Sequence, residues 1–524
     1  MSIYNFKFIG VLTVLFISFS MVSGEESASV VSLNEGTSEL PFSEMKYKDI
    51  PFPKFSDAKK LLPNPVIEDN PEFIKMYWYC WELAFSHLKK PNPKSGFVSN
   101  FLDEAFNRHI YQWDTIFMLM FARYGHTAYP FINSLNNFYC KQHENGYICR
   151  EILEKNGKDF YKTSDHPHAV NPPLFSWAEL ANFKLTGDKQ RLKKVFPVLI
   201  KYVTWLETGR KKAGTAHHLY WNSNFGSGMD NSPRSGSGWV DISSQMVIQY
   251  NNLVDIADIL GDKSQSERFQ KRASEIAVLI NKWMWNKEDG LYYDVDDAGN
   301  QVKRKTIASF WPMLANIVPK ENINSLVSNL KDPKTFWRTN VFPTLSADDP
   351  AYESNGGYWH GAIWAPTNMA VIKGLDKYKL YGVSYKASLR YVSVMSEVFR
   401  KTGTVWENYA PDSFDKGKPA RGKFVGWSGC GPIALLIEDI IGINCNAYSK
   451  SIQWNIHRLD RHGIENIRFG GICASLIAGK RKSQKDPLQI SVMSSAPFSL
   501  SVNIEGVIKT YAVKTGINSF TMDH

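Results

Sequence analysis

The chain has 524 residues, of which 43% are hydrophobic, 14% aromatic and 21% charged. These proportions exclude a mainly disordered chain, and they exclude a polytopic membrane protein because only the N-terminus is apolar over a long stretch. The net charge of +10 is compatible with nucleic acid or an acidic glycan as a partner. The surplus of aromatic residues is compatible with a pocket whose flat rings stack on sugars or bases.

The first 24 residues have the organisation of a secretory signal peptide. Lys7 is their only charged residue, residues 8–22 are almost wholly apolar or small, and Gly24 precedes two glutamates. We therefore predict cleavage near residue 24, export to the periplasm or the exterior, and no stable membrane span afterwards. A retained membrane anchor is the alternative. Residues 25–65, rich in Ser, Glu, Lys and Pro, are expected to form an extended segment.

Residues 66–445 carry the apolar periodicity of helices, separated by loops with many Gly, Pro and aromatic residues. The predicted amphipathic helices cover residues 74–88, 113–124, 174–185, 192–208, 243–260, 264–283, 323–330, 366–375, 385–402 and 431–441. Helices of this number and length would suit a toroid of helical hairpins, and we expect residues 66–445 to form one large domain.

Residues 446–524 have a different sequence pattern, with short runs rich in β-branched residues between turn residues. The predicted strands cover residues 451–459, 464–469, 488–492, 498–504 and 508–513. We expect a small all-β domain that resembles a β-sandwich. The basic run at residues 480–482 would lie in a turn, either as a contact for a polyanion or as a solvated loop. The other clusters of basic residues lie outside the loops described next, so we expect no nucleic-acid partner.

The sequence lacks the usual signatures of metal and phosphate chemistry. It has no Gly-rich phosphate loop, no zincin His pair and no Cys-x-x-Cys spacing. Cys140 and Cys149 are the nearest pair among six cysteines, and a disulfide or free thiols are both compatible with their spacing.

Several loops combine carboxylates with Trp and Gly, each next to a predicted helix. Glycoside hydrolysis needs one carboxyl that stays protonated and one that stays ionised, and an apolar aromatic wall raises the pKa of the first. Each carboxylate also has a structural interpretation of its own, because Asp114, Asp230 and Asp241 could cap helices and Glu407 could be a surface residue. The recurrence of Trp and Gly around all of them favours catalysis. The segments are 111–114, 226–234, 239–241, 357–366, 404–409 and 424–431.

These segments closely resemble the inverting (α/α)6-barrel glycosidases, which include trehalases, processing α-glucosidases and mannosylglycerate-hydrolase-like enzymes. Residues 227–234, Ser-Gly-Met-Asp-Asn-Ser-Pro-Arg, resemble the general-acid loop of processing α-glucosidases, whereas Gly226 stands where trehalases usually have Glu. Residues 406–409, Trp-Glu-Asn-Tyr, resemble the segment that carries the general base. The other matching segments are 111–114, 171–173 and 358–366.

The resemblance implies a mainly α protein with an (α/α)6 toroid, no cofactor and no metal. It implies an exo-acting enzyme that cleaves an α-glycosidic bond, first of all in an α-glucoside, with inversion. Asp230 would be the general acid and Glu407 the general base. The implied substrate-binding residues are Trp113, Asp114, Asn231, Trp359, His360, Trp364, Trp406 and Trp427.

Three alternatives remain open at the level of sequence. One is an α-mannosidase or another α-glycosidase of the same clan. Another is a polysaccharide lyase, for which Tyr409 and His360 could supply the base and the acid, and Asn408 could neutralise the uronate. The third is a glycan-binding protein without catalysis, in which the aromatic residues bind sugar and the carboxylates have no chemical role.

Overall fold

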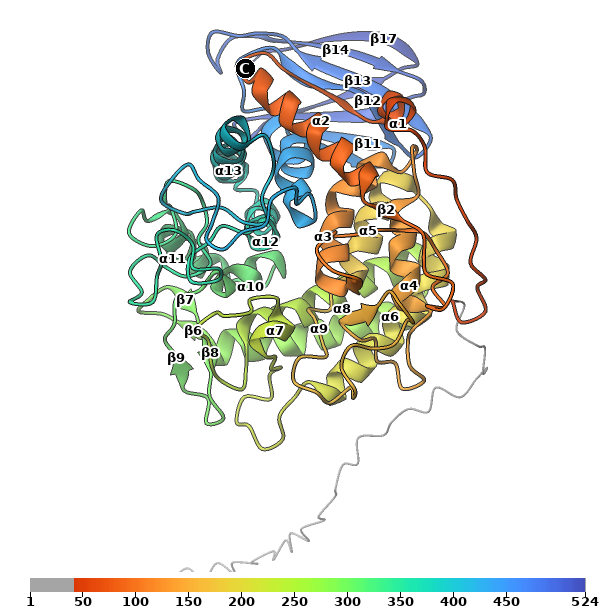
Figure 1. Cartoon of the computed structure of the whole chain (residues 1–524). Helices are drawn as coiled ribbons and strands as arrows, with labels where there is room; N and C mark the ends of the chain where they lie inside the picture. The colour runs from red at the N-terminus through yellow and green to blue at the C-terminus, as the bar shows by residue number, and fades with distance from the viewer. Residues whose placement is uncertain (1–41, 524) are drawn as a thin grey trace, which may run out of the picture. The chain divides into compact units, whose positions relative to one another are not determined.

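The computed structural model describes residues 42–523. The predicted signal peptide and part of the predicted extended segment lie outside the described residues. Helices are the main regular elements of the described chain up to residue 441, and a β-region follows (Figure 1). None of the described helices is both long and apolar enough to cross a bilayer.

Six inner helical positions follow one another in a closed circuit of contacts. Each packs against the next along the chain, and the last packs back on the first. Every residue of α3 is buried, which explains why its apolar residues run together instead of forming one stripe. The inner elements are α3 (Gln112–Ala122), α5 (Phe175–Thr186), α8 (Val240–Leu260), α10 (Trp311–Leu314), α12 (Ala365–Lys377), and η5 (Trp427–Cys430) with its π-helical continuation η6 (Gly431–Ile441).

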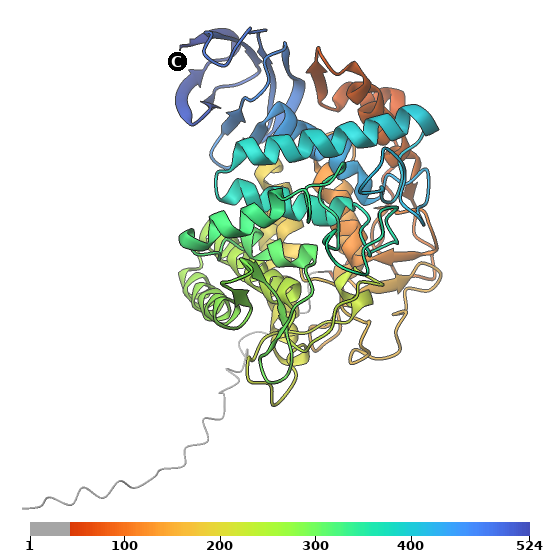
Figure 2. The ribbon, with the colours of Figure 1, turned by 90° about the vertical axis from the view of Figure 1, so that its left-hand side faces the viewer.

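Further helices lie outside this circuit, and the long helices α2, α6, α9 and α13 pack against it. In α9 the buried residues recur at intervals of three and four, and its opposite face is charged. Asp188 and Asp262 cap the N-termini of α6 and α9 with their side chains. Helices α12 and α13 lie side by side (Figure 2). The outer helices are α2 (Pro71–Ser86), α4 (Asn136–Tyr139), α6 (Lys189–Gly209), α9 (Lys263–Trp283), α11 (Lys320–Lys331) and α13 (Tyr381–Thr402).

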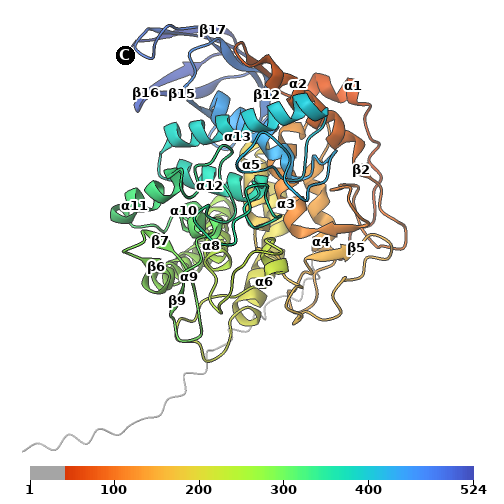
Figure 3. The same cartoon turned by 60° about the vertical axis from the view of Figure 1, so that its left-hand side comes forward.

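Short elements occupy the loops between these helices. Two of the hairpins lie beside α9 and α11 (Figure 3). The short helices are α1 (Phe55–Ala58) and α7 (Asn224–Ser227), and the paired short strands are β2 (Leu88–Lys89), β3 (Phe101–Leu102), β4 (His109–Tyr111), β5 (Glu151–Leu153), β6 (Trp285–Asn286), β7 (Leu291–Tyr292), β8 (Asp294–Val295) and β9 (Gln301–Val302).

Two sheets form the C-terminal β-region. One has the order β1-β12-β13-β14-β17 and is antiparallel, and the other has the order β10-β11-β15-β16 with a parallel pair at its centre. The rings of Phe469 and Phe498, one from each sheet, meet edge to face at 5.6 Å. The strands are β1 (Asn64–Ile67), β10 (Ile443–Asn446), β11 (Ser451–Asn455), β12 (His462–Phe469), β13 (Ile472–Ala478), β14 (Leu488–Ser494), β15 (Phe498–Ile504), β16 (Val507–Val513) and β17 (Gly516–Met522).

The structure has helices at all ten predicted positions and strands at all five, and it adds elements that the sequence did not reveal. Helix α10 has four residues, too few to show a period. Strand β13 contains small residues, β17 contains polar ones, and β1 contains Pro65. The mainly helical fold with a C-terminal β-region is therefore confirmed.

Two local alternatives from the sequence are also resolved. All six cysteines are free thiols, so Cys140 and Cys149 form no disulfide. Arg481, the middle residue of the basic run, is buried and donates to the carbonyl of Arg458 at 3.2 Å. The run therefore does not present three cations to a polyanion.

Candidate active site

A pocket of about 360 Å³ opens where the N-terminal ends of several inner helices meet. Asp114 comes from the first turn of α3, Asp230 from the loop after α7, and Glu407 from the loop after α13. The pocket brings together seven of the ten predicted site residues: Trp113, Asp114, Asp230, Trp359, Trp364, Glu407 and Trp427.

The loop that carries Asp230 is fixed by close packing against α3. Gly228 has a φ of +77°, and a Cβ there would lie 3.0 Å from the Trp113 indole, so only glycine fits without displacement. Asn171 joins the same two segments, because its Oδ1 accepts from the Trp113 amide at 3.3 Å and its Nδ2 donates to the Gly226 carbonyl at 3.0 Å. The position of Asp230 relative to Trp113 is thus set by backbone geometry.

Arg234 anchors the other end of this loop. Its guanidinium is fully buried between Asp241, at 2.5 Å, and Asp294, at 2.9 Å. It also lies 4.3 Å from the ring of Trp239. Asp241 therefore pairs with the loop and does not act as an N-cap, since the structure has no side-chain cap at the start of α8.

Glu407 is held by the backbone of a neighbouring loop. Its Oε2 accepts from the Arg421 amide at 3.2 Å, and its own carbonyl accepts from Trp427 Nε1 at 2.9 Å. Only 4% of the residue is exposed. The rings of Trp359 and Trp364 stack at 4.1 Å and 5°, which makes a flat, rigid aromatic wall for the pocket.

Burial shifts the pKa values of all three carboxyls upward. Burial raises the pKa of Asp230 to about 6 against the opposing charge of Arg150. Burial likewise raises the pKa of Glu407 to about 6, with Arg421 opposing the shift and the charge of Asp230 adding to it. Burial raises the pKa of Asp114 well above its usual range, and its Oδ1 has no hydrogen-bond partner among the described residues. A pocket with such groups can give and take protons near neutral pH.

Three predicted substrate-binding residues are not placed in the pocket. Asn231 uses its amide between loops, donating to the Gly357 carbonyl at 3.0 Å and accepting from the Trp359 amide at 2.8 Å. His360 Nε2 contacts the Asn231 carbonyl at 2.8 Å. Trp406 turns back toward α13, because its Nε1 donates to Thr402 Oγ1 at 3.0 Å and Lys416 covers its ring at 4.0 Å. Asn231 and His360 therefore link the loop of Asp230 to the segment of Trp359, and Trp406 is bound to the end of α13.

The pocket also contains residues that the sequence did not single out. Arg150 and Glu151 form an ion pair at 3.2 Å, and Arg421 also lines the pocket. An isolated Arg in an irregular segment has no pattern that marks it. Asn171 was visible as part of a matching motif, and it does line the pocket.

Comparisons with known proteins give matches over most of the chain. The profile of the mannosylglycerate hydrolase MGH1-like glycoside hydrolase domain matches residues 108–428. An uncharacterized protein of Borreliella burgdorferi is 29% identical over 89% of this chain and 99% of its own length. The mannosyl-oligosaccharide glucosidase of Saccharomyces cerevisiae is 21% identical over 48% of this chain, and the match spans about a third of that enzyme, 35%.

Solved structures give the same picture for the fold. The GH63 mannosylglycerate hydrolase of Thermus thermophilus, in complex with glucose, superposes with a TM-score of 0.55 at 17% identity. The superposition covers 68% of this chain and 99% of that enzyme. The neutral trehalase Nth1 of Saccharomyces cerevisiae gives a TM-score of 0.52 at 15% identity, over 66% of this chain and 76% of that chain.

Proposed function

Because the chain belongs to the mannosylglycerate hydrolase MGH1-like glycoside hydrolase family, we propose that this glycosidase cleaves a terminal α-glycosidic bond with inversion. The observation that carries the proposal is the pairing of Asp230 and Glu407 in one aromatic-walled pocket, each with a pKa near 6. An α-glucoside is the first candidate substrate, and an α-mannoside is the alternative within the same clan.

The proposed reaction is a single displacement. Asp230 in its protonated form donates to the glycosidic oxygen, while ionised Glu407 removes a proton from a water on the opposite face of the ring. The water attacks the anomeric carbon as the bond to the leaving group breaks, so the configuration inverts. Room for that water requires carboxyls roughly 6.5–9.5 Å apart.

The remaining pocket residues would position the sugar. Trp113, Trp359 and Trp364 supply flat apolar surfaces for its C–H faces, and Asp114 has a free oxygen for a hydroxyl group. The small volume favours one terminal sugar over an internal segment of a chain, which supports exo action.

A lyase is less well supported than a hydrolase. Tyr409 and Asn408 are buried outside the pocket, and the Tyr409 hydroxyl accepts from the Trp406 amide at 3.1 Å. His360 contacts the Asn231 carbonyl instead of a substrate position. The side chains that a lyase would need are therefore used elsewhere.

Two further proposals concern the whole chain. We interpret the closed circuit of inner helices as an (α/α)6 toroid in residues 66–445, with residues 446–524 as a β-domain whose two sheets also include β1 and β10. The match of the fold to the solved hydrolases supports this interpretation. The sequence of residues 1–24 supports export after cleavage.

The roles of the two carboxylates can be tested with Asp230→Asn and Glu407→Gln. Each should lower kcat about 10²–10⁴-fold on a natural disaccharide, because each removes a proton-transfer group. In an aryl glycoside with an acidic phenol, the phenolate leaves without needing a proton. Such a substrate should therefore restore turnover to Asp230→Asn but not to Glu407→Gln. Asp258→Asn, on the exposed face of α8, is the matched control. Full activity of either site variant, with unchanged folding by circular dichroism, would refute the assignment.

A further inference from the structure

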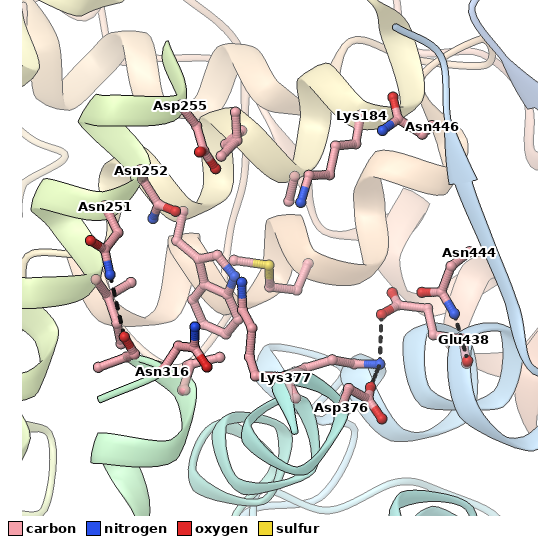
Figure 4. Close-up of a pocket in the computed structure, with 18 of the residues that line it drawn as sticks. Lys184, Asn251, Asn252, Asp255, Asn316, Asp376, Lys377, Glu438, Asn444 and Asn446 are labelled. Carbon is pink, nitrogen blue, oxygen red and sulfur yellow. Dashed lines mark hydrogen bonds and ion pairs between the residues drawn. The ribbon is translucent and has the colours of Figure 1, made fainter. Parts of the chain in front are cut away.

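Figure 4 shows a second and larger cavity, of about 930 Å³. It lies away from the candidate active site. The two share no lining residue. Residues of the inner helices line it together with β10 and β11 of the C-terminal β-region. Its size falls in the range of small-molecule sites, about 300–1,000 Å³.

The two cavities lie at opposite ends of the same helices. Trp113 and Asp114 at the start of α3 line the active-site pocket, whereas Met120 near its end lines the second cavity. Trp364, before the first residue of α12, lines the pocket, and Lys377 at its last residue lines the second cavity. The second cavity is therefore not an extension of the active site.

Three charged side chains of the described part of the chain face this cavity without a partner. Lys184 of α5, Asp255 of α8 and Lys377 of α12 make no ion pair or side-chain hydrogen bond among the described residues. Their charges nevertheless interact. Burial raises the pKa of the Asp255 carboxyl, and the charges of both lysines oppose that shift. The neighbouring Lys373 differs, because Asp376, Glu438 and Asp439 all lie within 3.1 Å of its Nζ.

Neutral polar groups and one indole complete the lining. The Asn316 side chain makes no hydrogen bond among the described residues, and Asn252 makes a single one, to Ser176 Oγ at 3.2 Å. Trp177 of α5 is half-buried and adds a flat apolar surface. The cavity is therefore lined by charged and neutral polar groups with free hydrogen-bonding capacity, and by one aromatic ring.

We propose that this cavity is a second saccharide-binding site, which takes a neutral sugar of one to three rings. A hydroxyl group accepts from an ammonium and donates to a carboxylate, so a polyhydroxylated ligand can satisfy Lys184, Asp255 and Lys377 at once. Asp255 disfavours an anion, and the two lysines disfavour a cation. Trp177 favours a ring with an apolar face over an acyclic polyol.

Binding can be measured on the full chain carrying Glu407→Gln, which slows hydrolysis if the proposed mechanism holds. The probes are maltose, α-1,2-mannobiose and trehalose, followed by saturation-transfer NMR and calorimetry. We expect at least one probe to bind at two sites. Lys184→Gln combined with Asp255→Asn should weaken one of them at least tenfold, and Trp359→Ala should weaken the other. Lys193→Gln, an exposed change on α6, is the matched control.

Two results would overturn the proposal. One is that no probe loses affinity in the Lys184→Gln/Asp255→Asn variant relative to the control. The other is that glucose 6-phosphate binds in a manner that depends on Lys184 and Lys377 while neutral sugars do not, because the site would then be anionic. Failure of the proposed mechanism would appear separately, as hydrolysis of the probe by the Glu407→Gln chain during the titration.

Discussion

Asp230 and Glu407 have similar pKa values for the same reason, the loss of water around each carboxyl. The nearest cation to each limits the shift, Arg150 for Asp230 and Arg421 for Glu407. Neither arginine makes an ion pair with its carboxyl within 4 Å among the described residues. Each carboxyl is thus half-ionised at about pH 6, where proton transfer in either direction costs little.

The pH dependence follows from these values. In the proposed mechanism Glu407 acts ionised, so activity should fall as the pH drops below about 6. Asp230 acts protonated, so activity should fall as the pH rises above about 6. We expect a narrow bell-shaped profile of kcat/KM with its maximum near pH 6. Rates measured from pH 4 to 9 check this. A flat profile across that range would contradict the two roles.

Only some of the individual pocket residues could be predicted from the sequence. Asp230, Glu407 and the tryptophans of the wall could be predicted because they lie in motifs that match a family. Arg150 and Arg421 could not, since single cations in loops carry no pattern. Asn231, His360 and Trp406 share motifs with pocket residues, but adjacent side chains in an extended loop point in different directions.

Among the elements, the loop between α7 and α8 depends most on a single buried group. Arg234 compensates Asp241 and Asp294, and Asp294 in turn accepts from the Val240 amide at 2.9 Å, in the first turn of α8. The ion network therefore connects the loop that carries Asp230 to the start of an inner helix and to the β8 hairpin.

Removal of this cation should have a large effect. Arg234→Met leaves two buried carboxylates without a partner, and we expect a loss of about 3–5 kcal/mol in the free energy of unfolding. The kcat of the variant should also fall, because Asp230 lies four residues before Arg234 in the same loop. Urea unfolding and steady-state kinetics measure both. Arg400→Ala, which breaks an exposed pair on α13, should leave stability almost unchanged. Equal stability of the two variants would show that the network does not hold the loop.

Helix and strand positions could be predicted wherever a period was long enough to see. The outer helices show one apolar stripe each, as α9 does with Phe269, Ala273, Ile276 and Ile280. Helix α10 was missed because its four residues make barely one turn, and strand β1 was missed because it contains Pro65, although both occupy necessary positions. The sequence also could not indicate the π-helical pitch of η6, since its apolar residues are buried on all sides.

At the scale of the whole molecule, β1 near the start of the described chain forms an edge of the five-stranded sheet in the C-terminal β-region. Strand β1 pairs with β12 at the sheet edge, and Asn64 Nδ2 donates to Glu465 Oε2 at 2.7 Å. The backbone of Asp69 donates to Asp460 at 3.0 Å, and Tyr77 of α2 donates to the Pro63 carbonyl at 2.6 Å. Residues nearly four hundred positions apart therefore stabilise one sheet.

A truncation tests this link. A chain that begins at residue 70 lacks β1 and leaves the backbone of β12 unpaired at an open edge, so we expect a lower melting temperature and aggregation. A chain that begins at residue 42 keeps β1 and serves as the control. Calorimetry and light scattering compare them. Identical melting and scattering of the two chains would mean that β1 contributes nothing to the sheet.

The stereochemistry of hydrolysis tests the central claim most directly. ¹H NMR of the first product released from an α-glycoside, recorded before mutarotation, identifies its anomer. The proposed single displacement by water activated at Glu407 predicts that the β-anomer appears first. Release of the α-anomer would require a double displacement and would contradict the roles assigned to Asp230 and Glu407.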